Sequence, residues 1–390
     1  MKTGRHFLFV PGPTNVPDRV LRAMDRPMVD HRSSEAPEMV RTVFPDLLKI
    51  FGSVNGQAFI FAGSGSAMWE ASLVNGLSTG DRVLAVRNGQ FSTLFIDTAQ
   101  RLGMKVDVID VEWGDGIPAD RVGDALAADT AHEIKAVLTV HNETATGVTS
   151  DIAAVRRAMD KAIHPALLYV DGVSSVASLD FRFDEWKVDF AIAGSQKGFM
   201  MPPGIGLLCV SKKALGMLDQ AKSPRAFFDL RDQVKHNAEG YFPYTPPVAH
   251  LFGLRAALDL LLEEGLPSVA ARHHRLGEGV RRAIAAWKLK LCARDPKVYS
   301  DTVSAIVVPD GMDAKKVIDI AFRRYNLSLG GGTGRLVGKV FRIGHVGDIN
   351  ELMVLGALSG VEMALNDTGI PVALGSGVAA AQQWFRESAK

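Results

Sequence analysis

The chain has 390 residues, a length that suggests roughly two or three domains. Its 44 Lys and Arg residues nearly balance its 43 Asp and Glu residues, and the resulting net charge of +1 argues against a nucleic-acid or membrane-surface protein, which would carry a basic excess. Two cysteines, Cys209 and Cys292, exclude a disulfide scaffold, and their apolar neighbours indicate reduced residues of a cytoplasmic protein. We expect no targeting or membrane segment, because no apolar run approaches the roughly 18 residues of a membrane span.

The part of the chain from residue 52 to about 210 alternates short apolar runs with helical segments. Several of the runs are continuously apolar, which is typical of strands that are covered on both faces. The alternation predicts an α/β fold with a mostly parallel sheet between layers of helices. The predicted strands cover residues 58–61, 82–86, 105–110, 136–140, 166–170, 190–193 and 206–210, and two of the predicted helices cover residues 67–77 and 151–161.

A different pattern follows a long predicted helix over residues 248–264, which Gly265 and Pro267 bring to an end. Helices are predicted over residues 269–286, 314–325 and 350–365, and strands over residues 302–308 and 339–344. We therefore predict an N-terminal arm over residues 1–20, a large domain over 21–265 and a smaller α+β domain over 266–390. The Ala- and Gly-rich segment from Gly375 onward predicts a loosely held tail.

Polar residues that directly follow the predicted strands are the candidates for a functional site, because ligands of open parallel sheets bind at the carboxyl ends of the strands. The turn Gly63-Ser64-Gly65-Ser66 precedes a helix whose N-terminus could bind a phosphate, although an ordinary strand-to-helix turn explains it equally well. Lys197 follows an apolar run, and such a lysine is suited to a Schiff base unless its ammonium group reaches the surface. Asp171 ends another apolar run and could hold a ring nitrogen in its protonated form, cap the next turn or bind Mg²⁺.

Taken together, these three features match the requirements of pyridoxal 5′-phosphate. The lysine would form the Schiff base, the aspartate would keep the pyridinium protonated, and the helix end would hold the phosphate. Once freed, the same lysine could move a proton as general base and general acid.

Three motifs resemble those of the class V aminotransferases of pyridoxal-phosphate fold type I: Val170-Asp171-Gly172-Val173-Ser174-Ser175, Gly194-Ser195-Gln196-Lys197 and Pro202-Pro203-Gly204. The likeness runs from about Arg5 to Phe385 with the motifs in the order of the family, and within the class the chain is most similar to bacterial serine–glyoxylate aminotransferases. The resemblance implies a large domain with a mostly parallel sheet and a smaller C-terminal α+β domain. It also implies a pyridoxal-phosphate enzyme that acts on small amino acids and 2-oxo acids, transferring an amino group from serine to glyoxylate to give hydroxypyruvate and glycine.

The resemblance also assigns the cofactor contacts by position. It implies that Lys197 is the Schiff-base lysine and that Asp171 is the partner of the pyridinium. The remaining cofactor residues that it implies are Ser64, Gly65, Ser66 and Gln196 at the phosphate, Phe91 and Val173 on the two faces of the ring, and Thr144 near the 3′-oxygen.

The same likeness implies how the substrate is bound and how the chain assembles. Arg342 matches the arginine that binds the substrate carboxylate, for which a bidentate guanidinium is the right shape. Pro11, Gly12 and His345 are expected near the substrate. Tyr244 and Thr245 lie in a segment that the family donates to the neighbouring site, which implies a homodimer with shared active sites and leaves a further pairing into a tetramer open.

Other functions remain as alternatives. Alanine or aspartate could replace serine as the donor, and an aspartate donor would need a second cation, for which Arg32 is a candidate. A class V lyase or cysteine desulfurase is less favoured, because a desulfurase needs a nucleophilic cysteine on a polar loop and both cysteines lie in apolar runs. We expect no metal site, since His273 and His274 are adjacent on a predicted helix and cannot face one metal together.

Overall fold

The computed structural model describes residues 4–34 and 36–389. Its larger sheet has seven strands in the order β2 (Gln57–Gly63), β10 (Gly204–Val210), β9 (Phe190–Gly194), β8 (Leu167–Asp171), β5 (Ile134–Val140), β3 (Arg82–Arg87) and β4 (Lys105–Asp110). Only β10 runs against the others, pairing antiparallel with both β2 and β9. Each of these strands overlaps a predicted one, so the mostly parallel sheet is confirmed.

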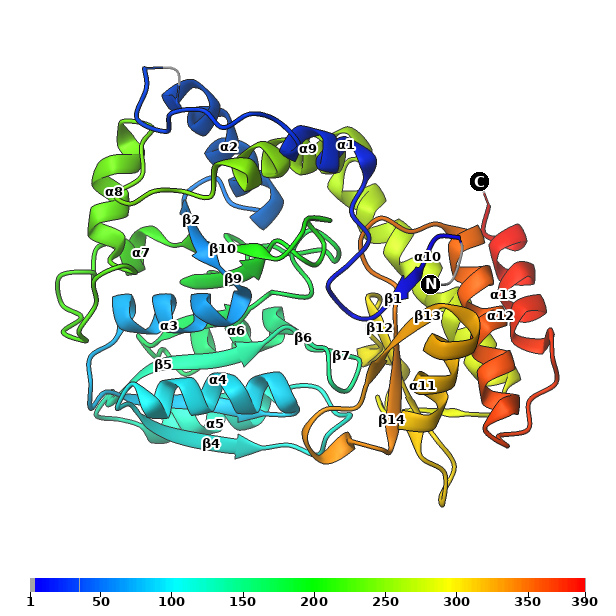
Figure 1. The fold of residues 1–390 in the computed structure, drawn as a ribbon. Coiled ribbons are helices and arrows are strands. Elements are labelled where there is room, and N and C mark those ends of the chain that lie inside the picture. The colour runs from blue at the N-terminus through cyan, green and yellow to red at the C-terminus, as the bar shows by residue number, and fades with distance from the viewer. Residues whose placement is uncertain (1–3, 35, 390) are drawn as a thin grey trace.

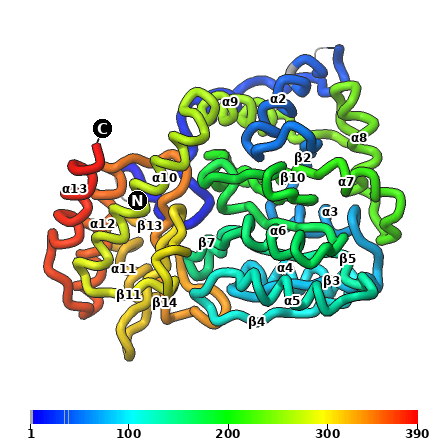
Figure 2. The backbone as a smooth tube through the Cα atoms, turned by 180° about the vertical axis from the view of Figure 1, so that it is seen from behind, coloured from blue at the N-terminus to red at the C-terminus, as the bar shows by residue number. Residues whose placement is uncertain are grey.

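Helices cover both faces of this sheet, which Figures 1 and 2 show from opposite sides. On one face lie α3 (Gly65–Gly76), α4 (Gln90–Arg101), α8 (Leu230–Ala238) and the short α7 (Lys212–Leu215). On the other face lie α2 (Ala36–Phe51), α5 (Ala119–Ala128), α6 (Ile152–Lys161) and α9 (Val248–Glu264), with α1 (Asp18–Met24) packed against α9. Because both faces are covered, β8 and β9 are buried at every position, which explains their continuously apolar sequences.

A second sheet lies beyond the carboxyl ends of the parallel strands (Figure 1). Its order is β1 (Phe7–Phe9), β13 (Leu327–Gly331), β14 (Val340–Gly344), β12 (Val303–Val307) and β11 (Lys290–Leu291), and β1 pairs parallel with β13 while the others pair antiparallel. The helices α10 (Leu266–Ala286), α11 (Ala314–Tyr325), α12 (Glu351–Asp367) and α13 (Ser376–Glu387) share a separate apolar core with it. The strands predicted over residues 302–308 and 339–344 correspond to β12 and β14.

Three connections join the two halves of the molecule. The N-terminal segment crosses from β1 to α1, and α10 begins directly after Gly265, where α9 ends. The small hairpin of β6 (Asn142–Glu143) and β7 (Val148–Thr149) reaches from the large sheet to Tyr299, which follows the 3₁₀ turn η1 (Pro296–Val298). Within the second sheet, another 3₁₀ turn, η2 (Gly334–Leu336), joins β13 to β14. The domain limits at residues 20 and 265 stay a prediction.

The prediction of a loosely held C-terminal tail is wrong, because this segment forms α13. Gly377, Ala381 and Phe385 recur at every fourth residue and are buried on one face of that helix. A Cβ atom on Gly279 of α10 would stand 2.3 Å from the ring of Phe385, so a glycine there permits the close contact of the two helices. Within the segment itself, a Cβ on Gly377 would stand 2.4 Å from Nε1 of Trp287. The small residue there therefore permits the tight packing of α13.

Candidate active site

A cavity of about 300 Å³ opens where the carboxyl ends of the parallel strands meet the N-terminal segment. Its walls come from loops that follow β2, β3, β5, β8 and β9, as the fold class predicts. The residues that line it are Gly12, Pro13, Gly65, Ser66, Trp69, Phe91, Asn142, Thr144, Asp171, Val173, Ser174, Gln196, Lys197 and Pro203. Most of the predicted cofactor residues are thus brought together in one place.

Lys197 lies in the turn after β9, where its Nζ donates a hydrogen bond to the carbonyl oxygen of Pro11. Burial of the ammonium group lowers the pKa of Lys197 to about 8; the nearby charge of Arg342 lowers it further, and Asp171 acts in the opposite direction. Gly12 has a φ of +127°, and a Cβ there would stand 2.5 Å from Nζ. Only glycine therefore lets the N-terminal segment pass so close to this lysine.

Asp171 is the last residue of β8, and its side chain is buried. One carboxylate oxygen accepts the backbone N–H of Val173 at 2.8 Å, and the other accepts Nε1–H of Trp69 at 3.0 Å. Burial raises the pKa of Asp171 to about 6, and these hydrogen bonds and the charge of Lys197 limit the increase. Trp69 was not among the predicted site residues, yet it fixes the orientation of this carboxylate.

The predicted phosphate turn begins α3. Ser64 is the N-cap residue of α3, and its hydroxyl makes no capping hydrogen bond. Gly65 and Ser66 are the first residues of the helix and line the cavity, so the backbone N–H groups of the first turn are available there. A Cβ on Gly65 would stand 2.5 Å from Val173, which shows how closely the turn approaches the loop after β8. The side-chain oxygen of Gln196 is buried and has no hydrogen-bond partner among the described residues, so its amide is available to a ligand.

Phe91 lies in the first turn of α4, and a buried carboxylate holds that turn in place. Glu143 accepts the backbone N–H groups of Phe91 at 3.2 Å, Ser92 at 3.0 Å and Ala145 at 3.1 Å. Burial raises the pKa of Glu143; the three N–H donors oppose this effect and the charge of Asp171 adds to it. Glu143 was not among the predicted site residues, although it directly precedes the predicted cofactor residue Thr144.

Arg342 projects from β14 of the second sheet toward the hairpin that carries Thr144. Its Nε donates to the carbonyl oxygen of Gly331 at 2.8 Å, and its Nη1 donates to the carbonyl oxygen of Thr144 at 3.1 Å. Only 8% of the residue is exposed, and no carboxylate of the described residues forms an ion pair with it. Burial lowers the pKa of Arg342 to about 10, and the charge of Glu143 opposes this effect. The guanidinium is therefore a buried cation without an anionic partner in the described chain.

Six predicted residues do not line the cavity. Ser64, Pro11 and Arg342 are bonded to residues that do, whereas His345, Tyr244 and Thr245 lie farther away. Both ring nitrogens of His345 have partners, the carbonyl oxygen of Asp301 at 2.9 Å and the hydroxyl of Ser304 at 3.1 Å, and burial lowers its pKa to about 3. A neutral, fully engaged ring of this kind indicates a structural residue. Tyr244 is 40% exposed and stacks on Phe227, and neither it nor Thr245 lines the cavity of its own chain.

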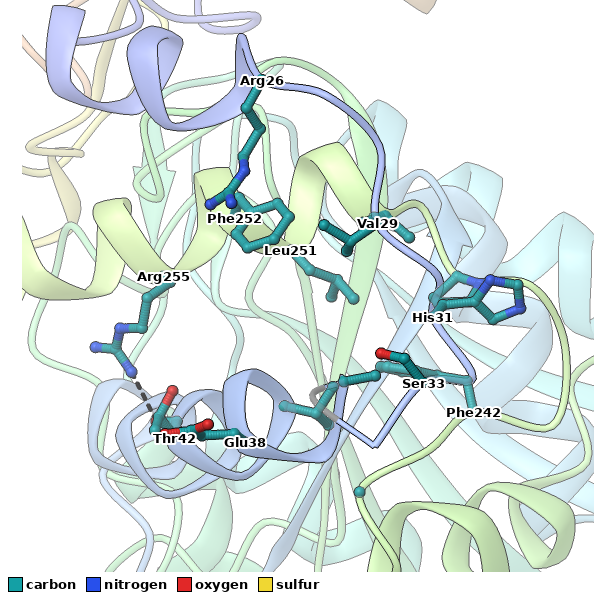
Figure 3. Close-up of a pocket in the computed structure, with 15 residues that line it drawn as sticks. Arg26, Val29, His31, Ser33, Glu38, Thr42, Phe242, Leu251, Phe252 and Arg255 are labelled. Atoms are coloured by element: carbon teal, nitrogen blue, oxygen red, sulfur yellow. Dashed lines mark hydrogen bonds between the residues drawn. The ribbon is translucent and has the colours of Figure 1, made fainter.

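A second, larger cavity of about 540 Å³ lies between the N-terminal half of α2 and the start of α9 (Figure 3). The guanidinium of Arg26 lies over the ring of Phe252, and Leu251 and Phe242 contribute apolar surface. None of the predicted catalytic or substrate residues lines it. Its walls include residues on both sides of the Tyr244–Thr245 pair, namely Phe242 and Pro246.

Within residues 4–34 and 36–389, no three His, Cys, Asp or Glu side chains gather where they could hold a metal ion. In the same described ranges, no helix is both long and apolar enough to cross a membrane.

The chain belongs to the class V aminotransferases, because the family model described as "Aminotransferase class-V" matches residues 6–332. Over nearly its whole length it is similar to enzymes that act on glyoxylate. It is 57% identical to a serine–glyoxylate aminotransferase from Methylorubrum extorquens, with 99% of this chain and 98% of the relative covered. It is 50% identical to an L-aspartate–glyoxylate aminotransferase from Paracoccus denitrificans, with 99% and 98% covered. The crystal structure of ureidoglycine–glyoxylate aminotransferase from Bacillus subtilis matches with a TM-score of 0.92 at 26% identity, covering 99% of both chains.

These comparisons confirm the predicted fold type, and class V aminotransferases depend on pyridoxal phosphate. The cavity fits that group. It offers a partly buried lysine, a buried carboxylate opposite it, a helix N-terminus close to both, and an unpartnered amide atom on Gln196. Lys197, Asp171, Gln196 and the Gly65–Ser66 turn are the residues that would hold the cofactor.

Proposed function

We propose that this aminotransferase transfers the amino group of serine to glyoxylate, producing hydroxypyruvate and glycine. The observation that carries the proposal is the unpaired, buried guanidinium of Arg342. It does not line the cavity of Lys197 and Asp171, but it bonds to Thr144, which does, and its charge acts on Lys197. A small acid with one carboxylate supplies the missing anion. The relative from Methylorubrum extorquens, named for this reaction, supports the choice of substrates.

Lys197 is the residue that we propose as the carrier of the cofactor and as the proton-transfer group. When bound, pyridoxal phosphate accepts the amino group and stabilises the negative charge that develops at the substrate Cα. A pKa near 8 leaves an appreciable fraction of Nζ neutral at physiological pH, as a base that removes the Cα proton must be. The carbonyl of Pro11 provides a resting contact for this amine when it is free.

Asp171 and Arg342 have separate electrostatic tasks in this proposal. Asp171, oriented by Trp69 and by the N–H of Val173, would hold a proton on the ring nitrogen of the cofactor. Arg342 would bind the carboxylate of serine in one half-reaction and that of glyoxylate in the other, in each case through a bidentate pair of hydrogen bonds. One guanidinium serves both because the two substrates are bound in turn.

The choice of donor follows from the number of cations at the cavity. Among the described residues that line the cavity, Lys197 is the only cation and is engaged in chemistry; Arg342 is the further cation whose charge acts on it. Serine or alanine therefore fits better than a dicarboxylic donor, which would need a further cation. Aspartate remains the second candidate because of the relative from Paracoccus denitrificans.

Desulfurase chemistry finds no support in the two cysteines, both of which are free thiols. Burial raises the pKa of Cys209 well above its ordinary value and raises that of Cys292 to about 11, so neither is an activated thiolate. Two free cysteines also support our proposal that the protein works in the reducing cytoplasm.

We further propose a homodimer in which each chain completes the site of the other. The support is that Tyr244 and Thr245 lie outside their own cavity, with Tyr244 exposed, beside the apolar cavity of Figure 3.

A donor panel tests the proposed function. The purified protein, loaded with pyridoxal phosphate, is assayed with glyoxylate and serine, alanine or aspartate in turn, and glycine is measured. We expect the highest kcat/KM with serine and no turnover in Lys197→Ala. A higher kcat/KM with aspartate than with serine would identify aspartate as the donor. Undiminished turnover in Lys197→Ala would show that Lys197 takes no part in the reaction.

A further inference from the structure

A buried polar network runs from the cavity into the second sheet. Asn142 and Ser174 line the cavity, and Nδ2 of Asn142 donates to the hydroxyl of Ser174 at 2.9 Å. The same Nδ2 also donates to the hydroxyl of Thr302 at 2.9 Å, and that hydroxyl donates to the carbonyl oxygen of Ser174 at 3.2 Å. All three residues are buried, with 2% of Asn142 and 1% of Thr302 exposed. The loops of the large sheet and the chain leading into β12 are thus joined by direct side-chain hydrogen bonds.

Thr302 is coupled to Arg342 through the register of the second sheet. Thr302 directly precedes β12, and its carbonyl oxygen accepts the N–H of His345, just beyond β14, at 2.8 Å. Within the pair of strands, Ala305 stands opposite Arg342. A displacement of the start of β12 therefore carries β14 and Arg342 with it.

The hairpin of β6 and β7 contacts the second sheet at a further point. Gly147 lies against β12, where a Cβ would stand 3.1 Å from the carbonyl oxygen of Val303 and 3.3 Å from the N–H nitrogen of Ala305. The guanidinium of Arg342 in turn donates to the carbonyl oxygen of Thr144 on the same hairpin. The hairpin, β12 and β14 consequently form a closed loop of contacts around the cavity.

We propose that Thr302 is a positioning residue for substrate binding: its hydroxyl, bonded to Asn142 and Ser174, fixes the position of β12 and of its partner β14, and hence the position of Arg342 relative to Lys197. The inference rests on the proposed function, in which Arg342 binds both carboxylates. Without the hydroxyl, Arg342 keeps its bond to Thr144, but the second sheet loses the hydrogen bonds that join Thr302 to Asn142 and Ser174. The carboxylates of donor and acceptor are then both bound less well. Lys197, Asp171, Gln196 and the Gly65–Ser66 turn make no bond to Thr302, so cofactor affinity should fall less than substrate affinity.

The test compares Thr302→Val with Thr139→Val. Thr139 is an equally buried threonine of β5, and its hydroxyl donates to the carbonyl oxygen of Tyr169 at 2.8 Å entirely within the large sheet. Each variant loses a buried hydroxyl. The hydroxyl of Thr302 has more hydrogen-bond partners than that of Thr139, so the free energy of unfolding is measured for both variants beside KM. We expect KM for both serine and glyoxylate to rise about 3- to 10-fold in Thr302→Val, which corresponds to about 1 kcal/mol of the hydrogen-bond energy of the hydroxyl, with kcat within about twofold and cofactor affinity changed less than either KM. Thr139→Val should leave both KM values at those of the wild type.

Two additional variants keep the test decisive. Thr302→Ser retains the hydroxyl and should restore both KM values, and Thr302→Ala replaces Thr302→Val if the latter does not fold. Equal KM values in the Thr302 and Thr139 variants, or a loss of cofactor affinity in place of substrate affinity, would overturn the proposal. A wild-type enzyme that is inactive with serine but active with another donor overturns only the proposed substrate, and the same comparison is then made with that donor.

Discussion

Lys197 and Arg342 bring two positive charges to one cavity, and each acts on the other. Burial is the main reason that the pKa of Lys197 falls to about 8, and the charge of Arg342 is the next. Asp171 is the only charge of the set that opposes this fall. The reactivity of the lysine therefore depends on the residue that binds the substrate.

This dependence predicts how the cofactor-free protein captures pyridoxal phosphate. Capture requires the neutral amine, so its rate should rise with pH through a midpoint near 8. Arg342→Gln removes a cause that lowers the pKa of Lys197, so the midpoint should move to higher pH. The measurement is the rate of the absorbance change at a series of pH values. Arg255→Gln, a change on α9 outside this cavity, serves as the control, and an unshifted midpoint in Arg342→Gln would contradict the coupling.

Most residues that contact the proposed cofactor site could be predicted because each follows a strand in sequence. Lys197, Asp171, Phe91 and Thr144 all lie at or just beyond the carboxyl ends of strands, and the parallel sheet brings these ends to one edge. Trp69 could not be predicted in the same way, because it reaches Asp171 only through the packing of α3 over the sheet, across 102 residues of sequence.

At the scale of elements, strands buried on both faces were the most predictable, whereas elements defined by a distant partner were not. β1 has three residues and exists because it pairs with β13, more than 300 residues later in the chain. The helix α13 depends likewise on α10 and α12, because the reason for its small residues is visible only in the aromatic rings that pack against them. A local pattern of hydrophobicity contains neither relation.

Glu362 of α12 is predicted to be the main polar anchor of α13. Its carboxylate accepts Nε1–H of Trp287 at 2.9 Å and the backbone N–H groups of Gly375 and Gly377, each at 2.6 Å. Glu362→Ala leaves these buried donors without a partner and should lower the free energy of unfolding by about 3 kcal/mol. Urea denaturation measures this, with the exposed Glu387→Ala expected to change it by less than about 0.5 kcal/mol. Similar values for the two variants would show that α13 is held by its apolar face alone.

At the scale of the whole molecule, the site is built where two halves meet. The large sheet supplies Lys197, Asp171 and the phosphate turn, and the second sheet supplies Arg342. The sequence predicted both sets, but the relative position of the halves depends on buried contacts such as Asn142–Thr302 that no periodicity contains.

The proposed dimer makes a quantitative prediction for mixed subunits. Lys197→Ala and the double variant Tyr244→Ala, Thr245→Ala should each have little activity alone. Co-assembly would unite, in one site of each mixed dimer, an intact Lys197 with an intact partner segment. Random pairing should therefore restore about a quarter of the wild-type activity, since half of the dimers are mixed and one site in two is complete. No recovery in verified mixed dimers would show that each chain builds its site alone.

The central claim is that Lys197 and its surroundings move an amino group from serine to the cofactor and then to glyoxylate in separate steps. The most direct measurement supplies the loaded protein with serine alone, removes the small molecules, and then adds glyoxylate alone. We predict one equivalent of hydroxypyruvate per chain in the first step and one equivalent of glycine per chain in the second. Glycine formed without prior exposure to serine, or no hydroxypyruvate until glyoxylate is present, would contradict this account.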